Sequence, residues 1–497
     1  MVQEIEFVEP SVGLVAYSQG HVELPEELKQ IVSDLQERGD MKLAEKVSSL
    51  SSIGPTELVT YGARGCRSRS TSVQLYENDL KKWLDELNTD VSSFSEADLL
   101  AIREKLHEKN EHMLDETVGS GHLAALDQSG FYTFSLKDVT REVTLFLCAS
   151  HYASHMQQSL RVVEPTGAYI PRLIRSTRLG HMLQEIFIDD LALYREMVSE
   201  GIPAEDARYA LALKSTTNIQ STLNARELTC IRLLAQQGVP EVVRRVVEVM
   251  VRQAESVSPG LFKKRGPNTN ILNYYPASQL FALENKGMRR CVKQFSRGSN
   301  AVLIPESYCK IDLQDLKGSV RKKDTAELAN LKHIHFTFLV PQSISCFHQS
   351  TRQRTWDQSV EPLNQALTRK QYVVPPTIEK SKFAGEFRES VERKFNLRSE
   401  MLEEGFQLSE VNGIVAHAHV VYGLIHMNGW NAIYSLGIRR CDNAQWEINE
   451  RADEMAEIIG RINPKLGYLS QPNCRRFGYC SERRPCKSKE SYLASFK

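Results

Sequence analysis

Some short polar clusters in this sequence are suited to binding a phosphate. Gln157, Ser159 and Arg161 lie close together after an apolar helical pattern. A serine and an arginine two residues apart in an extended segment point to the same side. The arginine can bind a phosphate through its planar guanidinium, and the serine through its hydroxyl. Taken alone, the cluster is better explained as a solvated turn.

A second polar group follows in the strings DARYALAL and TLNAREL. Arg208 stands in the first string, and Asn224 and Arg226 stand in the second. An Asn-x-Arg pair can orient an amide and a cation toward a ligand. The same pattern is typical of a helix cap followed by an exposed arginine, so both interpretations stay open here.

The spacing of similar strings indicates an internal duplication. Thr133-Phe134 and Thr337-Phe338 are 204 residues apart, and Asn224 and Asn428 are separated by the same number. Equal offsets at two separate places favour a tandem repeat of about 200 residues. Chance likeness between short strands and helices is the alternative explanation.

The strings around these residues resemble the flavin-dependent thymidylate synthase family. That family carries an R-H-R motif, then an S-x-R element, and later M-N-A-R-E-L and A-Q-W-E-I segments. The most specific match is NAQWEI at 443–448. Other matching strings are GHLAALDQ (121–128), FYTFSLKDVTREVTLFLCASHYASHMQQSLRVV (131–163) and FTFLVPQSISCFHQSTRQRTWDQS (336–359). The resemblance covers roughly residues 56–255 and 268–465.

Each half departs from the family pattern where the other half keeps it. In the first half the R-H-R register falls on Ala149-Ser150-His151, while Ser159 and Arg161 are kept. In the second half Arg352-Gln353-Arg354 keeps both arginines, but no S-x-R element follows. Later in the chain, Arg439 restores an arginine that is replaced by Ala235 in the first half.

The resemblance therefore implies sites composed of residues from both halves. It assigns catalytic roles to Ser159 and Arg208. It implies substrate contacts from Gln157, Ser159, Arg161, Arg208 and Arg439. It implies flavin contacts from His122, Asn224, Arg226, Arg352, Arg354 and Asn428. Because the family builds its active sites between subunits of a homotetramer, we expect two of these double-length chains to pair as a homodimer.

The resemblance also implies a reaction. The family converts dUMP to dTMP, with methylene-tetrahydrofolate as the one-carbon donor and reduced FAD as the hydride donor, and NAD(P)H is the expected reductant. A changed pyrimidine nucleotide substrate is one alternative. The other is a degenerate, non-catalytic protein that still binds flavin or nucleotide.

We expect the elements that position these residues to form an α/β (α+β) fold, with two tandem domains that form a pseudo-dimer, each a central sheet flanked by helices. The strings FYTFSL (131–136) and HFTFLV (335–340) predict strands, as does TELVTYG (56–62). Apolar periodicity predicts helices over 176–200 and throughout 205–255. The expected units are a helical N-terminal extension (1–52), a first domain (53–259), a linker (260–269), a second domain (270–468) and a basic tail (469–497).

Composition limits the other functions. The 497 residues hold 62 Lys plus Arg against 62 Asp plus Glu, and this zero net charge makes nucleic acid an unlikely partner. No apolar run reaches 18 residues, so no membrane span is expected. The scattered cysteines are typical of reduced thiols in a cytoplasmic protein. Cys474, Cys480 and Cys486 lack zinc-site spacing, so no metal is predicted. We interpret His417 and His419 as structural.

Overall fold

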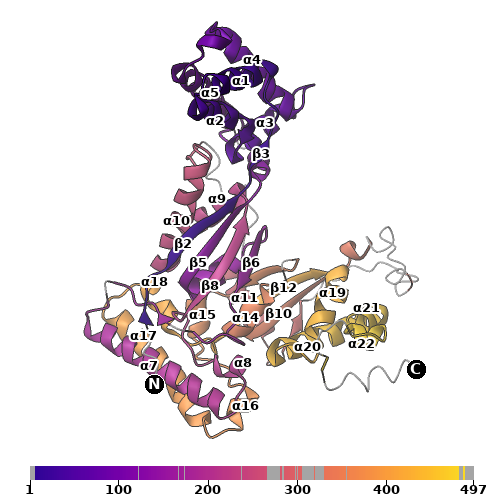
Figure 1. Ribbon diagram of the computed structural model, residues 1–497. Helices are drawn as coiled ribbons and strands as arrows, with labels where there is room; N and C mark the ends of the chain where they lie inside the picture. Colours follow the sequence, from indigo (N-terminus) through magenta and orange to yellow (C-terminus); the bar gives the residue numbers. More distant parts are fainter. Residues whose placement is uncertain are drawn as a thin grey trace.

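The computed structural model describes most of the chain (Figure 1). It covers residues 6–265 (except 121, 166, 173 and 237), 280–304 (except 283, 284, 297 and 299), 318, 330–480 (except 354) and 485–486. The expected mixture of helices and sheets is confirmed. Both large sheets are antiparallel, which places the fold in the α+β class.

Two four-stranded sheets carry the two halves of the chain. The first has the strand order β2-β5-β8-β6, and the second has the order β9-β10-β12-β11. In the first sheet the strands are β2 (Ser11–Tyr17), β5 (Tyr132–Thr140), β8 (Thr216–Leu223) and β6 (Ala153–Gln157). In the second they are β9 (Val302–Leu303), β10 (His335–Ser343), β12 (Val420–Asn428) and β11 (Asp357–Val360).

Two short ladders lie outside these sheets. Strand β1 (Glu6–Phe7) pairs in parallel with β7 (Gly167–Ala168). Strand β3 (Gly20–His21) pairs in antiparallel fashion with β4 (Ser52–Ile53). The second ladder pairs the residues just before α1 with the residues just before α3.

A helical head extends from the first sheet at the top of Figure 1. Its helices bury one apolar core, in which Leu28, Leu80 and Ile102 are almost completely shielded from solvent. They are α1 (Glu26–Glu37), α2 (Met41–Ser48), α3 (Pro55–Gly65), α4 (Ser72–Leu87) and α5 (Glu96–Thr117), with 3-10 turns η1 (Ser49–Ser51), η2 (Val91–Ser93) and η3 (Leu123–Ser129).

Some helices of the first half pack against its sheet, and others lead to the second half. Val247 and Met250 of α10 pack in one apolar core with Phe134 of β5. Thr140 and Asn224 cap two of these helices through their side-chain oxygens. The set comprises α6 (Arg141–Cys148), α7 (Arg178–Ser199), α8 (Ala204–Ala207), α9 (Ala225–Leu234) and α10 (Glu241–Val257).

The helices of the second half follow a similar order. Ala452 and Met455 of α20 pack with Phe336 and Phe338 of β10. The set comprises α11 (Lys286–Phe295), η6 (Asn330–His333), α14 (Ile344–Ser350), α15 (Leu363–Leu367), α16 (Pro376–Glu379), α17 (Ala384–Glu403), α18 (Leu408–Val411), η7 (Asn412–Ile414), α19 (Gly429–Arg439), α20 (Trp446–Ile462), α21 (Pro464–Leu469) and α22 (Asn473–Arg476).

The long helices α7 and α17 lie side by side and join the two halves (Figure 1). Lys394 of α17 forms a buried ion pair with Asp190 of α7. Next to it, Arg393 Nη1 lies 2.6 Å from Asp189 Oδ2 at the surface. The two halves are therefore held together by charged contacts as well as by apolar side chains.

Several local predictions were wrong. TELVTYG lies in helix α3 because Pro55 takes the first helical position and Glu57 Oε2 accepts a hydrogen bond from Gly54 N at 3.0 Å. The predicted helix over 205–255 is interrupted by strand β8. The N-terminal extension, by contrast, contains the expected helices from Glu26 onward, after an extended start in which β2 pairs with β5.

The segments next to the two expected connections are partly folded. Arg265 is buried and lies 2.8 Å from Glu111 of α5, so the beginning of the expected linker packs on the head. In the expected basic tail, Arg476 is buried and its Nη1 donates to the Ile433 carbonyl at 2.9 Å. Within the described residues, no helix combines the length and apolar character needed to cross a bilayer.

Candidate active site

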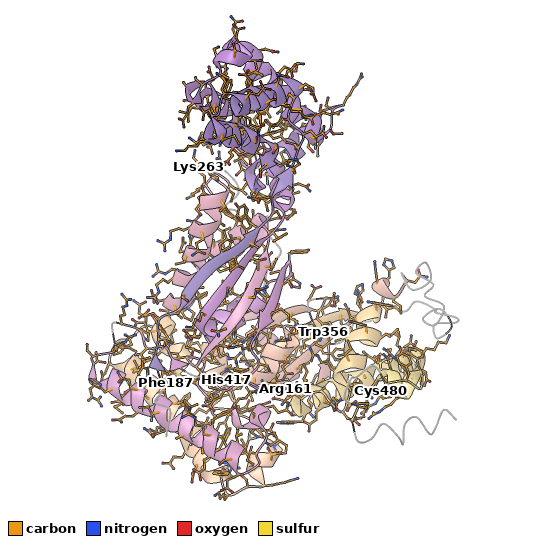
Figure 2. The ribbon with its side chains drawn as sticks, viewed as in Figure 1. Arg161, Phe187, Lys263, Trp356, His417 and Cys480 are labelled. Atoms are coloured by element: carbon orange, nitrogen blue, oxygen red, sulfur yellow. The ribbon has the colours of Figure 1, made fainter. Side chains whose placement is uncertain are left out.

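A cavity of about 280 Å³ lies where the two halves meet. Figure 2 shows Arg161 and His417 close to this junction, and both residues line the cavity. The first half contributes Arg141, Gln157, Gln158, Ser159, Leu160, Arg161 and Arg208, and the second half contributes Ser345, His348, Gln349, Arg352, His417 and Arg439. Neither half alone forms this lining.

Strand β6 and the turn after it position the first group. Gln157 ends β6, where it faces Ile219 of β8, and its Nε2 donates to Thr144 Oγ1 at 3.2 Å. The chain then turns, and Ser159 Oγ accepts a hydrogen bond from Arg161 N at 3.3 Å. This local bond fixes the turn and keeps the serine beside the arginine.

Arg208 is positioned by a turn that the second half holds in place. The Tyr209 hydroxyl donates to Glu447 Oε2 at 2.6 Å and accepts from Gln445 Nε2 at 2.8 Å. Trp446 Nε1 donates to Asp206 Oδ1 at 2.8 Å. The string NAQWEI thus binds the turn that carries Arg208 to the second half.

The same glutamate orients the helix that supplies the second group. Glu447 Oε2 accepts from Ser343 Oγ at 2.6 Å, and Ser343 Oγ in turn caps α14 by accepting from Cys346 N at 3.0 Å. Helix α14 carries the lining residues Ser345, His348 and Gln349. Glu447 therefore connects both sets of lining residues.

Gln353 positions Arg439 at the cavity. With its amide oxygen assigned to face the arginine, Gln353 accepts from Arg439 Nη2 at 2.7 Å and from Nε at 2.8 Å. In that orientation its amide nitrogen donates to Ser435 Oγ at 3.1 Å. The glutamine that replaces the family histidine thus holds a guanidinium toward the cavity.

The lining is strongly cationic. It contains five arginines and no carboxylate. Arg161 Nε lies 2.7 Å from Glu205 Oε2. Among the described residues, no carboxylate forms an ion pair with Arg141, Arg208, Arg352 or Arg439. Burial and the nearby Arg208 lower the pKa of Arg141 to about 9, which leaves it cationic at neutral pH. Such a cavity favours an anionic ligand.

Two histidines add neutral polar groups to this lining. Burial lowers the pKa of His417 to about 3, and the neighbouring Arg141 and Arg208 contribute to this shift. His417 Nδ1 lies 2.6 Å from the Leu211 carbonyl, so we assign the proton to Nδ1. Its Nε2 is then a hydrogen-bond acceptor, in a lining where the arginine side chains are all donors. Burial also lowers the pKa of His348 well below its usual value.

Buried polar atoms at the cavity lack partners within the described part of the chain. They are Arg141 Nε, Arg208 Nη2, His348 Nε2, Gln349 Nε2 and His417 Nε2. Arg141 and His417 are 4% and 2% exposed, so bulk solvent reaches them little. Buried groups of this kind are normally hydrogen-bonded, and their arrangement here fits a ligand with acceptor oxygens and at least one donor.

The structure brings together all the residues predicted to bind substrate, and Arg352 with them. The other residues predicted to bind flavin lie elsewhere or outside the described residues. His122 is exposed and directly precedes η3. Asp127, within η3, accepts from Asn224 Nδ2 at 3.1 Å and from Arg226 Nη1 at 2.9 Å.

The two asparagines act as helix caps at the outer ends of the sheets. Asn224 Oδ1 accepts from Glu227 N at 2.9 Å at the start of α9. Asn428 Oδ1 accepts from Asn431 N at 3.0 Å at the start of α19. Of the two interpretations that the sequence leaves open for Asn224, the cap is the one that the structure displays. Arg354 lies outside the described residues.

Sequence reasoning missed several lining residues. Arg141, Ser345, His348 and Gln349 were not predicted, and His417 was interpreted as structural. Arg141 and Ser345 occupy the first turns of their helices, directly after the caps Thr140 and Ser343. A search for polar residues just after matched caps in the two halves would have found these two.

Three cysteines near the C-terminus lie among the described residues. Cys474 is buried in α22, and Cys480 and Cys486 are half-buried. Across the described ranges, no three His, Cys, Asp or Glu side chains are placed to hold a metal ion.

Comparison with known proteins identifies the family of the chain. The thymidylate synthase complementing protein family matches residues 51–260 and 321–465, more than half of the chain in two segments. The flavin-dependent thymidylate synthase of Geobacter sulfurreducens is 31% identical over 173 residues, which cover 33% of this chain and 74% of that protein. That of Saccharolobus solfataricus is 30% identical over 177 residues, which cover 33% of this chain and 67% of that protein.

One solved structure is also similar. It is a crystal structure of a UMP/dUMP methylase, PolB, from Streptomyces cacaoi bound with 5-Br dUMP. Its sequence identity is 13% and its TM-score is 0.33, with coverage of 52% of this chain and 94% of that chain. The family assignment rests on the two matching segments: the chain belongs to the thymidylate synthase complementing protein family, the flavin-dependent thymidylate synthases, in a tandem layout.

Proposed function

We propose that the cavity binds dUMP, a pyrimidine nucleoside monophosphate, by its phosphate. The observation that carries this proposal is a lining with five arginines and no carboxylate, shared between the two halves. A phosphate dianion would satisfy the guanidinium groups of Arg161, Arg208 and Arg439 and the hydroxyl of Ser159. It would also offset the mutual repulsion of the arginines, which is strongest where they are buried.

The proposed reaction is reductive methylation of the nucleotide to dTMP, with methylene-tetrahydrofolate as the one-carbon donor and NAD(P)H as the reductant. A bound FAD would supply the hydride chemistry. This chain's residues hold and orient the nucleotide, and their contacts with the uracil monophosphate are the proposed catalytic contribution of Ser159 and Arg208. His417 Nε2 is placed to accept a hydrogen bond from a sugar hydroxyl or a base N–H group.

Among the described residues, those expected to contact flavin do not meet in one place within a single chain. Arg352 lines the cavity, whereas Asn224 lies beyond the far end of strand β8. Ile219, the partner of Gln157, and Asn224 are five residues apart along that strand, roughly 16 Å. Asn224 and Arg226 are also already bound to Asp127. A flavin site from these residues therefore needs a second chain, which is why we propose a homodimer.

A non-catalytic nucleotide-binding protein is the second candidate, and one observation favours it. The histidine of the R-H-R motif is absent from both halves at its family position, and Gln353 there is occupied in holding Arg439. Binding of the phosphate would survive this change. Use of a different pyrimidine nucleotide is also compatible with the same cavity.

The deciding experiment combines spectra and product analysis. The purified chain is supplied with FAD, NADPH, methylene-tetrahydrofolate and dUMP, and dTMP is measured by mass spectrometry. We expect the protein to show a flavin absorbance spectrum, either as purified or after FAD is added. We also expect dTMP to form. Rescue of a thymidine-requiring bacterial strain would test the same reaction in cells.

Two variants address the sharing of the site between halves. Arg161→Ala and Arg352→Ala each remove a cavity arginine from a different half, and each is expected to reduce dTMP formation by at least about tenfold. Full activity in either variant would contradict a shared site. Nucleotide binding without flavin uptake or product would favour the non-catalytic candidate.

A further inference from the structure

Reciprocal backbone contacts relate the two halves by an approximate two-fold axis. Leu213 N donates to the Val415 carbonyl at 3.2 Å, and His417 N donates to the Leu211 carbonyl at 3.0 Å. His417 and Val415 stand 204 residues after Leu213 and Leu211, so the second bond repeats the first with the halves exchanged. Ala212 pairs with its own counterpart, Ala416. A residue that contacts its own counterpart marks a two-fold axis.

We call two residues counterparts when they occupy the same position in the two halves, and the strand pairing of the sheets identifies the counterpart of each lining residue. Thr133 faces Thr222 across β5 and β8, and Thr337 faces His426 across β10 and β12, so the offset is 204. The irregularity after Leu136 adds one residue to β5 and reduces the offset to 203 along the following segment. There Gln157 faces Ile219, and Val360 faces Gly423.

The two-fold axis predicts a second location equivalent to the cavity, and most counterparts there are apolar or small. The counterparts of Arg141, Gln157, Ser159, His348, Arg352, His417 and Arg439 are, in order, Ile344, Val360, Pro362, Leu145, Ala149, Leu213 and Ala235. Leu213 and Ile344 are 0% exposed and Leu145 is 1% exposed. These three pack in one apolar core with Val360 and Ala235.

The remaining polar counterparts are bound to other side chains. Asn364 and Asn412 replace Arg161 and Arg208, and Arg398 Nη2 donates to their Oδ1 atoms at 3.0 and 3.1 Å. Glu142 replaces Ser345, is fully buried and lies 3.2 Å from Lys214 Nζ. Polar groups at this location are thus satisfied within the protein, whereas Arg141 Nε, Arg208 Nη2 and His417 Nε2 at the cavity lack partners in the described part of the chain.

We infer that each chain forms one nucleotide site, and that the location related to it by the two-fold axis is closed by apolar core and takes up no nucleotide. The inference rests on the proposed function of the cavity. A phosphate at the second location would meet no arginine from the positions that line the cavity. It would also have to displace Leu145, Leu213 and Ile344 from a close-packed core.

Binding stoichiometry tests this inference directly. The purified full chain is titrated with dUMP by isothermal calorimetry, with protein concentration fixed by amino-acid analysis. We expect one dUMP per chain. Two per chain would overturn the inference and leave the proposed nucleotide binding intact. Absence of saturable binding at millimolar dUMP would overturn the proposed function itself and the inference with it.

A matched pair of variants distinguishes the two locations. Arg161→Ala changes the cavity, and Asn364→Ala changes the counterpart position, which is half-buried. We expect Arg161→Ala to weaken dUMP binding by about tenfold to a hundredfold, because a charged hydrogen-bond donor is lost. Asn364→Ala should leave both affinity and stoichiometry unchanged. A lower stoichiometry in Asn364→Ala would overturn the inference.

Discussion

At the scale of single residues, His417 is the unusual member of the cavity. Its Nδ1 contacts the Leu211 carbonyl at 2.6 Å, which leaves Nε2 as an acceptor in a lining dominated by donors. Its counterpart is Leu213, a residue of the apolar core. The substitution His417→Leu therefore gives this position the side chain that its counterpart has in the first half.

We expect His417→Leu to weaken dUMP binding about fivefold, because one neutral hydrogen bond contributes about 1 kcal/mol. The matched control is His419→Leu. His419 is equally buried and also contacts a backbone carbonyl, that of Ala416 at 3.1 Å, but it does not line the cavity. Calorimetric titration of both variants is the measurement, and equal affinities would contradict the role given to Nε2.

The same buried histidines make stability depend on pH. Burial lowers the pKa of His419 to about 4 in the folded chain, whereas an unfolded histidine titrates near 6.5. Between these values the unfolded chain binds the proton and the folded chain does not, so stability falls as pH falls. At pH 5 the loss from His419 is about 2 kcal/mol.

Thermal unfolding at pH 7 and pH 5 measures this effect. We expect the difference between the two pH values to shrink in His419→Leu, because the titrating group is gone. His112→Ala, at an exposed position on α5, is the control and should keep the difference seen in the parent chain. A His419→Leu variant that loses as much stability as the parent would contradict the assignment.

Residue patterns predicted one part of the cavity and missed the other for a physical reason. Ser159, Arg161 and Arg208 carry family motifs, so their types and spacing are informative. His348 and His417 have no such motif, and their role arises because the two halves meet around them. Contact across a two-fold axis leaves no local signal in the sequence.

At the scale of elements, long strands and helices with clear periodicity were predictable, and segments with mixed signals were not. Strand β8 combines buried residues with a polar sequence, TTNIQSTL, because it is a central strand between β5 and β6. Helix α3 begins at Pro55, after the cap residue Gly54, in a segment whose string TELVTYG predicts a strand. Pairing with neighbouring strands makes the polar segment a strand, and the N-terminal cap with its proline makes the other segment a helix.

The packing of α7 on α17 depends on a charge pair next to the two-fold axis. Asp190 and Lys394 are counterparts, and both are almost fully buried as an ion pair. In a symmetric pair of identical helices these positions would carry the same charge and repel each other. Opposite charges therefore favour pairing of the first half with the second.

We expect Asp190→Ala to destabilise the chain by about 3–5 kcal/mol, because it leaves the Lys394 ammonium buried without a partner. Asp189→Ala is the matched control: its partner Arg393 is at the surface, and the loss should be about 0–1 kcal/mol. The double variant Asp190→Leu/Lys394→Met should recover most of the stability. Chemical denaturation measures all three, and equal effects of the two alanine variants would contradict this role.

At the scale of the whole molecule, the two halves hold each other by contacts that do not depend on the covalent connection. Backbone bonds join 209–213 to 415–418, and the NAQWEI string binds the turn that carries Arg208. The helical head packs on residues 263–265 through Glu111. The last described residues of the first half, up to Arg265, are thus bound to its own helical head.

A protease cleavage site inserted between residues 266 and 279 tests this arrangement. After cleavage we expect the two fragments to elute together on size-exclusion chromatography and to bind one dUMP per pair, because both sets of lining residues remain in contact across the junction. Each fragment purified alone should bind no dUMP, since Arg161 and Arg208 lie on one fragment and Arg352 and Arg439 on the other. An uncleaved sample of the same variant is the control. Nucleotide binding by either isolated fragment would show that one half is sufficient, and the composite cavity would then be abandoned.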